Sequence, residues 1–180
     1  MVNLNKGISA PVAFTIIIVL AIVLVGGIFV YQYYYLPKDE TVNWKIYSNE
    51  EYGFEIKYPD NYKISTDSGS IVGPDIVSDE PPVSISFLVH DNSGDLVLSE
   101  WVKSDLVIHD VSIKWQPIIV DNIESLKSPI GGNMDGGVEY DVLIPQKDKI
   151  YQILFSTKAS NTETELEVFD QILSTFKFID

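Results

Sequence analysis

The sequence predicts an α+β protein in which one N-terminal transmembrane helix precedes a soluble domain, built from an antiparallel sheet covered by helices. Three observations lead to this fold class. Residues Val12 to Val30 form an apolar run without a charged residue. After Trp44, short segments that alternate apolar and polar residues are joined by turn residues, which is typical of antiparallel strands. Near the C-terminus the apolar residues change to helical spacing.

The apolar run VAFTIIIVLAIVLVGGIFV, residues 12–30, is long enough to cross a bilayer as one helix. Nineteen helical residues span roughly 28 Å, close to the roughly 30 Å thickness of the hydrocarbon layer. Four tyrosines between residues 31 and 35 suit the membrane interface, and Pro37 ends the helix. We therefore expect a tail over residues 1–10, a transmembrane anchor over 11–36 whose residues 12–36 contact lipid, a linker over 37–42 and a soluble domain over 43–180.

Four other interpretations of this segment fit less well. A buried core helix of a soluble protein would normally show a polar face, which this run lacks. A cleaved signal peptide has an apolar core of about 7–15 residues and a small-residue cleavage site, whereas this run is longer and continues into Phe29, Val30 and Tyr31. A lipoprotein needs a cysteine, and the sequence has none. A type IV pilin carries glutamate five residues after the processed glycine, but the residue five after Gly7 is Val12. An uncleaved anchor is the favoured interpretation.

The orientation of the anchor is expected from the sizes of its flanks. Lys6 precedes the run, and Lys38 and Lys45 follow it, so the basic residues barely differ between the two sides. For an uncleaved anchor of this kind, the usual outcome is that the short N-terminal tail stays in the cytoplasm and the large C-terminal domain is translocated. We expect a single-pass protein of the cell membrane with its C-terminal domain outside the cytoplasm.

The soluble part is strongly acidic. All 12 basic residues of the chain are lysines, and two of them, Lys6 and Lys38, lie in the first 38 residues, so the remainder carries 10 lysines against 26 acids and a formal charge of −16. Such a surface repels phosphate backbones, so we expect no nucleic-acid binding. The absence of cysteine excludes disulfides, thiol catalysis and cysteine-based zinc sites.

The strand segments follow one another along the soluble part. The clearest is GFEIKYP, residues 53–59, in which Phe54, Ile56 and Tyr58 alternate with charged residues until Pro59 ends the strand. We expect a loop over Ser68–Pro82 with at most a short strand at Ile71 and Val72. The other predicted strand segments are WKIYS, NYKIS, PVSISFLVHD, VSIKWQPIIV, NIESLKSPI, GGVEYDVLIPQ and KIYQILFST.

Two helices are expected in the soluble part. SEWVKSDLV, residues 99–107, predicts a short helix capped by Ser99, with Trp101 packed inward. TETELEVFDQILSTFKFI, residues 162–179, predicts a longer helix that begins with a capping box formed by Thr162 and Glu165. Its apolar residues share one face that should lie on the sheet: Leu166, Phe169, Ile172, Leu173 and Phe176.

Three motifs occur in a recognisable order. They are WKIYSNEEYGFEIKYP at residues 44–59, LSEWVK at residues 98–103 and FDQILSTFKF at residues 169–178. Together they resemble the PsbP-like family, and in particular its bacterial PsbP-related members with one N-terminal anchor, over roughly residues 43–179. The resemblance implies an α/β/α sandwich with a central antiparallel sheet. The photosystem role of the plant proteins depends on an N-terminal extension, which a membrane helix replaces here, so that role is not inherited.

One loop has the composition of a cation site. In DNSGD, residues 91–95, the side chains of Asp91, Ser93 and Asp95 offer oxygen at alternate positions. An EF-hand loop would need glycine at its sixth position and glutamate at its twelfth, where this chain has Leu96 and Val102. A turn rich in turn-forming residues is the simpler interpretation. A hydrated, weakly binding cation site at Asp91, Ser93 and Asp95 is the alternative.

Other chemistry-bearing residues have structural interpretations. GGNMDGG, residues 131–137, lacks the lysine and following helix of a phosphate loop, so we expect a hairpin connection. His90 and His109 lack a nucleophile-elbow motif such as GxSxG, so we expect no serine-type triad. The three tryptophans, Trp44, Trp101 and Trp115, are expected in or near the core.

The sequence as a whole favours a membrane-tethered, non-catalytic binding or accessory domain without a cofactor, whose partner is a membrane or envelope protein. Two alternatives stay open. One is a hydrolase of envelope or glycan substrates that would bring two carboxylates together in a concave pocket. The other is a cation-responsive module that uses the 91–95 loop.

Overall fold

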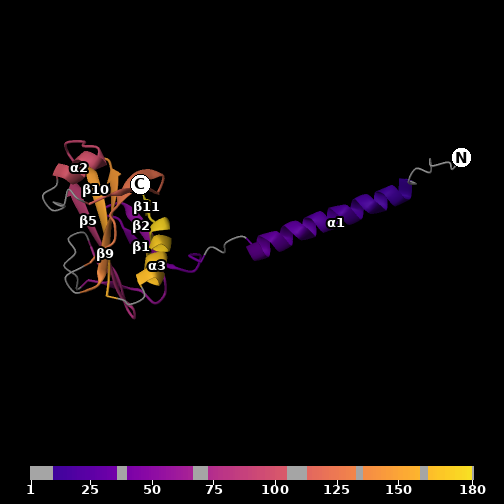
Figure 1. The fold of residues 1–180 in the computed structure, drawn as a ribbon, viewed down its shortest axis with the longest axis horizontal. Coiled ribbons are helices and arrows are strands. Elements are labelled where there is room, and N and C mark those ends of the chain that lie inside the picture. Colours follow the sequence, from indigo (N-terminus) through magenta and orange to yellow (C-terminus); the bar gives the residue numbers. More distant parts are fainter. Residues whose placement is uncertain are drawn as a thin grey trace. The chain divides into compact units, whose positions relative to one another are not determined.

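The computed structural model describes residues 10–35, 40–66, 73–104, 113–132, 136–158 and 162–179. The chain divides into two compact units, residues 1–39 and 40–180. The first contains helix α1 (Ala10–Tyr35), and the second contains the sheets and the two shorter helices. Figure 1 shows the elements of each unit.

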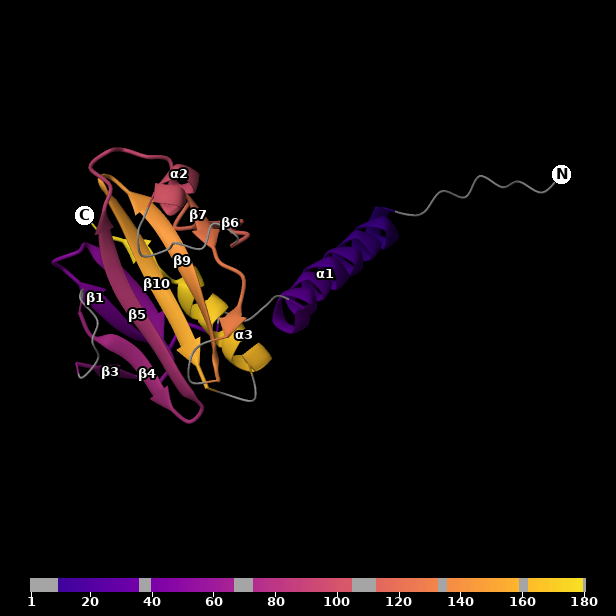
Figure 2. The same cartoon turned by 60° about the vertical axis from the view of Figure 1, so that its left-hand side comes forward.

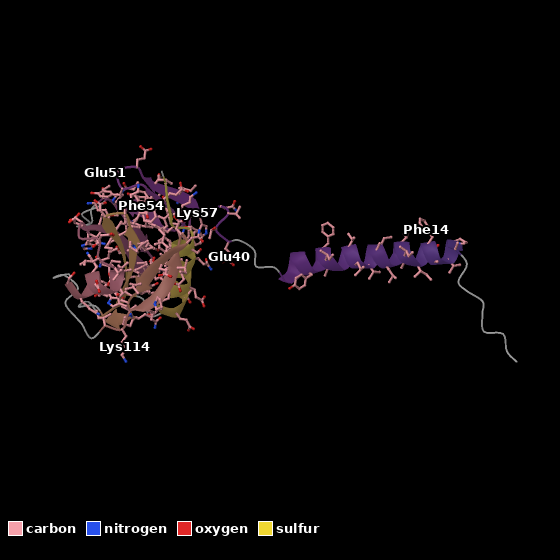
Figure 3. All side chains as sticks on the ribbon, turned by 90° about the horizontal axis from the view of Figure 1, so that it is seen from above. Phe14, Glu40, Glu51, Phe54, Lys57 and Lys114 are labelled. Atoms are coloured by element: carbon pink, nitrogen blue, oxygen red, sulfur yellow. The ribbon has the colours of Figure 1, made fainter. Side chains whose placement is uncertain are left out.

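Helix α1 is apolar around its whole circumference, with no acidic residue in its first turn and no basic residue in its last. Its segment Ala10–Tyr31 is the one helix among the described residues that is long and apolar enough to cross a membrane. Within α1 the only hydroxyl before Tyr31 is that of Thr15, and it donates to the carbonyl of Pro11 at 3.0 Å, so this polar group is satisfied within the helix. Figure 3 shows Phe14 projecting from α1. A membrane anchor and a signal sequence both contain a helix of this kind.

The larger sheet of the second unit contains eight strands within the described residues, and all its pairs are antiparallel. Its order is β3-β4-β5-β10-β9-β7-β6, and the short strand β8 also pairs with β9. At its centre Phe155 is paired with Ile85 on one side and Tyr140 on the other. The strands are β3 (Lys63–Ser65), β4 (Asp75–Asp79), β5 (Pro82–Asp91), β6 (Gln116–Val120), β7 (Ile123–Lys127), β8 (Gly131–Gly132), β9 (Val138–Gln146) and β10 (Lys149–Thr157).

One face of this sheet is covered by α3 (Thr162–Ser174) and by a second, three-stranded sheet. The smaller sheet has the order β1-β2-β11 and consists of β1 (Lys45–Asn49), β2 (Phe54–Tyr58) and β11 (Lys177–Phe178). The core between these layers is aromatic, because the ring of Phe54 lies 5.1 Å from that of Phe87 and 5.4 Å from that of Phe176. Figure 1 shows α3, β1, β2 and β11 on the same side of the larger sheet.

Helix α2 (Leu98–Ser104) covers part of the opposite face. Alternation along β9 and β10 sends Leu143 and Ile150 to this face, where both are fully buried beside Trp101. Helices therefore cover both faces of a central antiparallel sheet, as the predicted sandwich requires. The inward packing of Trp101 is also confirmed, and Trp44 and Trp115 pack against the two cores as partly buried side chains.

The structure corrects three local predictions. The helix expected over residues 162–179 ends at Ser174, and Lys177–Phe178 form the strand β11, which pairs with β2. Strand β4 lies inside the stretch Ser68–Pro82 that we expected to be a loop, while Ile71 and Val72 lie outside the described residues. Its segment DIVSD pairs with both β3 and β5. The hydrogen bonds to these two strands stabilise an extended conformation although turn-forming residues surround the segment. Ser99 is not the cap of α2, because the helix begins at Leu98 and the carbonyl of Val97 accepts the first amide hydrogen bonds.

Candidate binding groove

An open groove of about 790 Å³ lies where the loop before α2 faces strands β6 and β7. Figure 2 shows α2 beside these two strands at one end of the domain. The lining is mainly apolar, and two of its side chains are among the more exposed large apolar residues of the domain: Val97 is 61% exposed and Ile119 is 66% exposed. Other apolar residues of the lining include Leu96, Leu98, Pro117, Leu126 and Pro145.

One wall of the groove is held in shape by Asn92, which is 6% exposed. Its side-chain amide donates to the carbonyl of Leu96 at 3.0 Å and accepts the amide hydrogen of Leu96 at 3.1 Å. Its backbone donates to the carbonyl of Asp148 at 2.7 Å, which ties the loop to the turn between β9 and β10. Because the side-chain amide and the backbone N–H of this one buried residue make all three bonds, the loop that presents Leu96 and Val97 is fixed before any partner arrives.

The opposite wall is the β6–β7 hairpin. Its two-residue turn, Asp121 and Asn122, has φ angles of 49° and 62°, the left-handed values of a type I′ turn, which Asp and Asn tolerate. The Oδ2 atom of Asp121 accepts the backbone N–H of Phe178 at 2.9 Å, so the turn is attached to β11. Alternation then sends Val120 into the core and leaves Ile119 exposed in the groove.

The charged residues of the groove lining are Asp95, Glu124 and Lys147. None of the three has an ion-pair partner among the described residues. The neighbouring Asp91 differs, because its Oδ1 atom lies 3.1 Å from Nζ of Lys149. The groove therefore combines a mainly apolar lining with three charges that have no ion-pair partner in the part of the chain that the structure describes.

A second hollow, of about 670 Å³, lies beside the end of α3 and shares Ile118 and Ile119 of β6 with the first groove. Its charges are largely matched within the domain. Lys127 donates to Oδ1 of Asp170 at 2.7 Å and lies 4.4 Å from the ring centre of Tyr140, while Lys177 pairs with Glu55 at 2.9 Å. Because these groups satisfy one another, the first groove is the better candidate for a binding site.

The three predicted cation-site residues, Asp91, Ser93 and Asp95, lie at the end of β5 and in the loop before α2. Hydrogen bonds from Ser93, and then from the ammonium of Lys149, hold the pKa of Asp91 below its usual range. An ammonium therefore already compensates this carboxylate. Asp95 has a φ of 49° and lines the groove. The described residues contain no group of three or more His, Asp and Glu side chains arranged to hold a metal ion. The cation site stays a prediction.

Sequence reasoning missed a polar chain beneath α2. Nε2 of His90 lies 2.6 Å from Oε1 of Gln152, and Nε2 of Gln152 donates to Oδ1 of Asp141 at 2.7 Å. The three residues belong to the adjacent strands β5, β10 and β9. Burial raises the pKa of Asp141, although the hydrogen bond from Gln152 and the charge of His90 oppose this. The sequence shows polar residues at alternate positions within each of these strands. It does not show which strands are adjacent, so it could not predict that these three side chains meet.

The contacts of His90 give it a structural role. Its ring lies 5.3 Å from that of Trp101 in an edge-on arrangement, and the indole Nε1 of Trp101 donates to the carbonyl of Asp91 at 3.3 Å. His90 thus connects α2 to the sheet. His109 lies outside the described residues, as do residues 133–135 of the glycine-rich segment, whose first two glycines form β8.

Known proteins resemble the chain in structure and not in sequence. No family model and no curated protein sequence matches it. The solution structure of cyanobacterial PsbP (CyanoP) from Synechocystis sp. PCC 6803 has a TM-score of 0.54 at 15% identity and covers 79% of this chain and 97% of its own. The Ran-binding protein Mog1p of Saccharomyces cerevisiae has a TM-score of 0.50 at 13% identity, covering 77% of this chain and 96% of its own.

A crystal structure from Bacteroides thetaiotaomicron VPI-5482 has a TM-score of 0.53 at 11% identity. That match covers 77% of this chain and 50% of the other, so the chain spans about half the length of the Bacteroides protein. The similarity to CyanoP bears out the family resemblance that the sequence motifs at residues 44–59, 98–103 and 169–178 indicated. The chain therefore consists of an N-terminal apolar helix and a domain with the PsbP-like α+β fold.

Proposed function

We propose that this chain is a membrane-tethered, extracytoplasmic and non-catalytic binding or accessory protein. Its PsbP-like domain would dock a membrane or envelope protein in the groove between the 92–97 loop and the β6–β7 hairpin. The observation that carries the proposal is the exposure of Val97 and Ile119 in a groove whose walls are already fixed by hydrogen bonds. Apolar side chains held open to water in this way are typical of interaction sites.

The apolar helix supports the membrane-bound part of the proposal. The segment Ala10–Tyr31 has the length and composition of a membrane span, and residues 37–42 are a short polar stretch between it and the domain. A short connection restricts the domain to a thin layer above the bilayer. The effective concentration of partners in the same membrane rises accordingly, so that a modest groove can act as a docking site.

Two further points favour binding over hydrolysis. A glycoside hydrolase needs one carboxyl group that burial keeps protonated. The carboxylates of the groove, Asp95 and Glu124, are both exposed, and the floor between the walls is apolar. In addition, one protein of this fold, Mog1p, is a Ran-binding protein, so the fold is compatible with the docking of another protein.

A matched pair of substitutions tests the docking site. Ile119→Glu places a charge in the groove, and Ile46→Glu places one at a similarly exposed isoleucine of β1, 58% exposed against 66%. Full-length protein is isolated from briefly crosslinked membranes, and the recovered proteins are quantified by mass spectrometry. We expect at least one membrane or envelope protein to be lost from Ile119→Glu and retained with Ile46→Glu. An identical set of proteins from both variants and the wild type would contradict the proposal.

A further inference from the structure

The groove lining contains two carboxylates and one ammonium group without ion-pair partners among the described residues. Asp95 lies in the loop before α2, Glu124 on β7 and Lys147 in the turn after β9. The lining is thus acidic by one charge, and it belongs to a soluble part with a formal charge of −16. A cationic partner would meet favourable potential both at long range and at the groove itself.

The hairpin wall determines how a polypeptide could bind. Strand β6 is the last strand of the larger sheet among the described residues. Because the Val120–Ile123 pair closes its antiparallel ladder with β7, alternate residues of β6 bond to β7, and Pro117 and Ile119 turn their backbone groups toward the outer edge. Pro117 has no N–H to donate, which weakens this edge as a template for strand addition. Recognition must therefore rely on side chains that enter the groove, where Val97, Ile119 and Leu126 provide the apolar contact.

We propose that the groove binds an extended polypeptide segment in which apolar side chains are flanked by lysine or arginine. The apolar side chains lie against Val97, Ile119 and Leu126, and the flanking cation lies at the carboxylates of Asp95 and Glu124. This inference rests on the proposed docking function and adds the chemistry of the partner. An acyl chain is the less suitable occupant, because the groove is open and an acidic domain repels anionic headgroups.

The test uses the full-length protein in nanodiscs of zwitterionic lipid, with empty nanodiscs as the background. A random heptapeptide display library is selected against the wild type. The selected peptides are then measured against Asp95→Asn with Glu124→Gln, and against a control of equal charge change on α3, Glu163→Gln with Glu167→Gln. Asparagine suits position 95 because it tolerates the positive φ of that residue.

We expect selected peptides to combine apolar residues with lysine or arginine. At low salt the groove variant should bind these peptides about tenfold more weakly than the wild type, whereas the α3 control should bind them almost as tightly as the wild type. At higher salt the difference between the wild type and the groove variant should shrink, because salt screens the charges. Apolar peptides without a charge preference, bound equally by the groove variant but lost with Ile119→Glu, would overturn the charge inference and leave the docking function intact. No enrichment above empty nanodiscs, or enrichment that ignores Ile119→Glu, would overturn both.

Discussion

Gln152 accepts a hydrogen bond at Oε1 from Nε2 of His90, over 2.6 Å, and its own Nε2 donates a hydrogen bond to Oδ1 of Asp141. This side chain is 9% exposed and joins three neighbouring strands below α2. A buried amide in this position aligns the imidazole under Trp101 and the carboxylate on β9 at once. Helix α2, which directly follows the groove wall, therefore rests on these polar residues as well as on apolar contacts.

The first prediction concerns the hydrogen-bonded row of His90, Gln152 and Asp141. Gln152→Leu should lower the free energy of unfolding of residues 40–180 by about 1–3 kcal/mol, because it leaves the buried carboxylate and the imidazole without their partner. Urea titration followed by tryptophan fluorescence measures the change. The control Gln116→Leu, at an exposed position of β6, should stay within about 0.5 kcal/mol of the wild type. Equal effects of the two substitutions would contradict the structural role of Gln152.

The second prediction concerns pH. Because the pKa of Asp141 is raised in the folded state, the folded protein holds this proton more tightly than the unfolded chain does. The contribution of Asp141 to stability should therefore decrease as pH rises from the ordinary carboxyl value, about 3.9, through the raised pKa. Asp141→Asn keeps an oxygen that can accept from Gln152 but cannot ionise. Its stability relative to the wild type should increase with pH.

Urea titrations of both proteins from about pH 4 to about pH 7 provide the comparison for Asp141. The exposed Asp95→Asn variant serves as the control, since its carboxylate has no partner among the described residues. A stability difference between Asp141→Asn and the wild type that stays constant over this range would contradict the assignment.

The third prediction concerns the buried carboxylate beneath α3. The hydroxyl of Tyr62 donates to Oε2 of Glu165 at 3.1 Å, and Glu165 is 6% exposed. Burial and the charge of Glu165 raise the pKa of Tyr62, so the hydroxyl keeps its proton and remains a donor. Tyr62→Phe should destabilise the domain by about 1.5–3 kcal/mol in thermal or urea unfolding. Tyr58→Phe, in the same core, should cost less, and the reverse order would refute this account.

How much of this was predictable varies with the element. Strands β2 and β10 and the body of helix α3 were predicted correctly because their apolar residues repeat with a clear period of two or 3.6. The predicted helix was too long at its C-terminal end, where residues 177–178 pair with β2 as strand β11. Strand β4 was missed because DIVSD lies among glycine, proline and aspartate, and its stability comes from β3 and β5 on either side. Glu165 was predicted in a capping box, which stays a prediction; its bond to Tyr62 joins segments 103 residues apart and has no local signal.

The groove could not be predicted from the sequence for a related reason. Its two walls come from residues 92–99 and 117–126, which face each other only because β10 and β9 lie between β5 and β7 in the sheet. Asp95 was singled out as a cation ligand, whereas in the structure it lines this groove. The role of Asn92 depends on a side chain turned back onto Leu96, which composition alone does not reveal.

The fourth prediction concerns the anchor. Leu20 lies near the middle of the apolar segment Ala10–Tyr31, and a lysine there should raise the cost of membrane insertion by about 2.5–3.5 kcal/mol. The wild-type protein and Leu20→Val should remain in the membrane pellet after an alkaline wash, while Leu20→Lys should appear partly in the supernatant. Release of the wild type by the same wash, or a mature protein without this segment, would argue against a membrane tether.

The central claim is that the groove contacts another protein while the chain is anchored in the membrane. A photo-crosslinking amino acid at position 119, compared with one at position 46, tests it most directly in intact cells. The account predicts a discrete crosslinked species from position 119 that sediments with alkaline-washed membranes, and no such species from position 46. Equal crosslinking from both positions, or a crosslinked species that washes off the membrane, would contradict it.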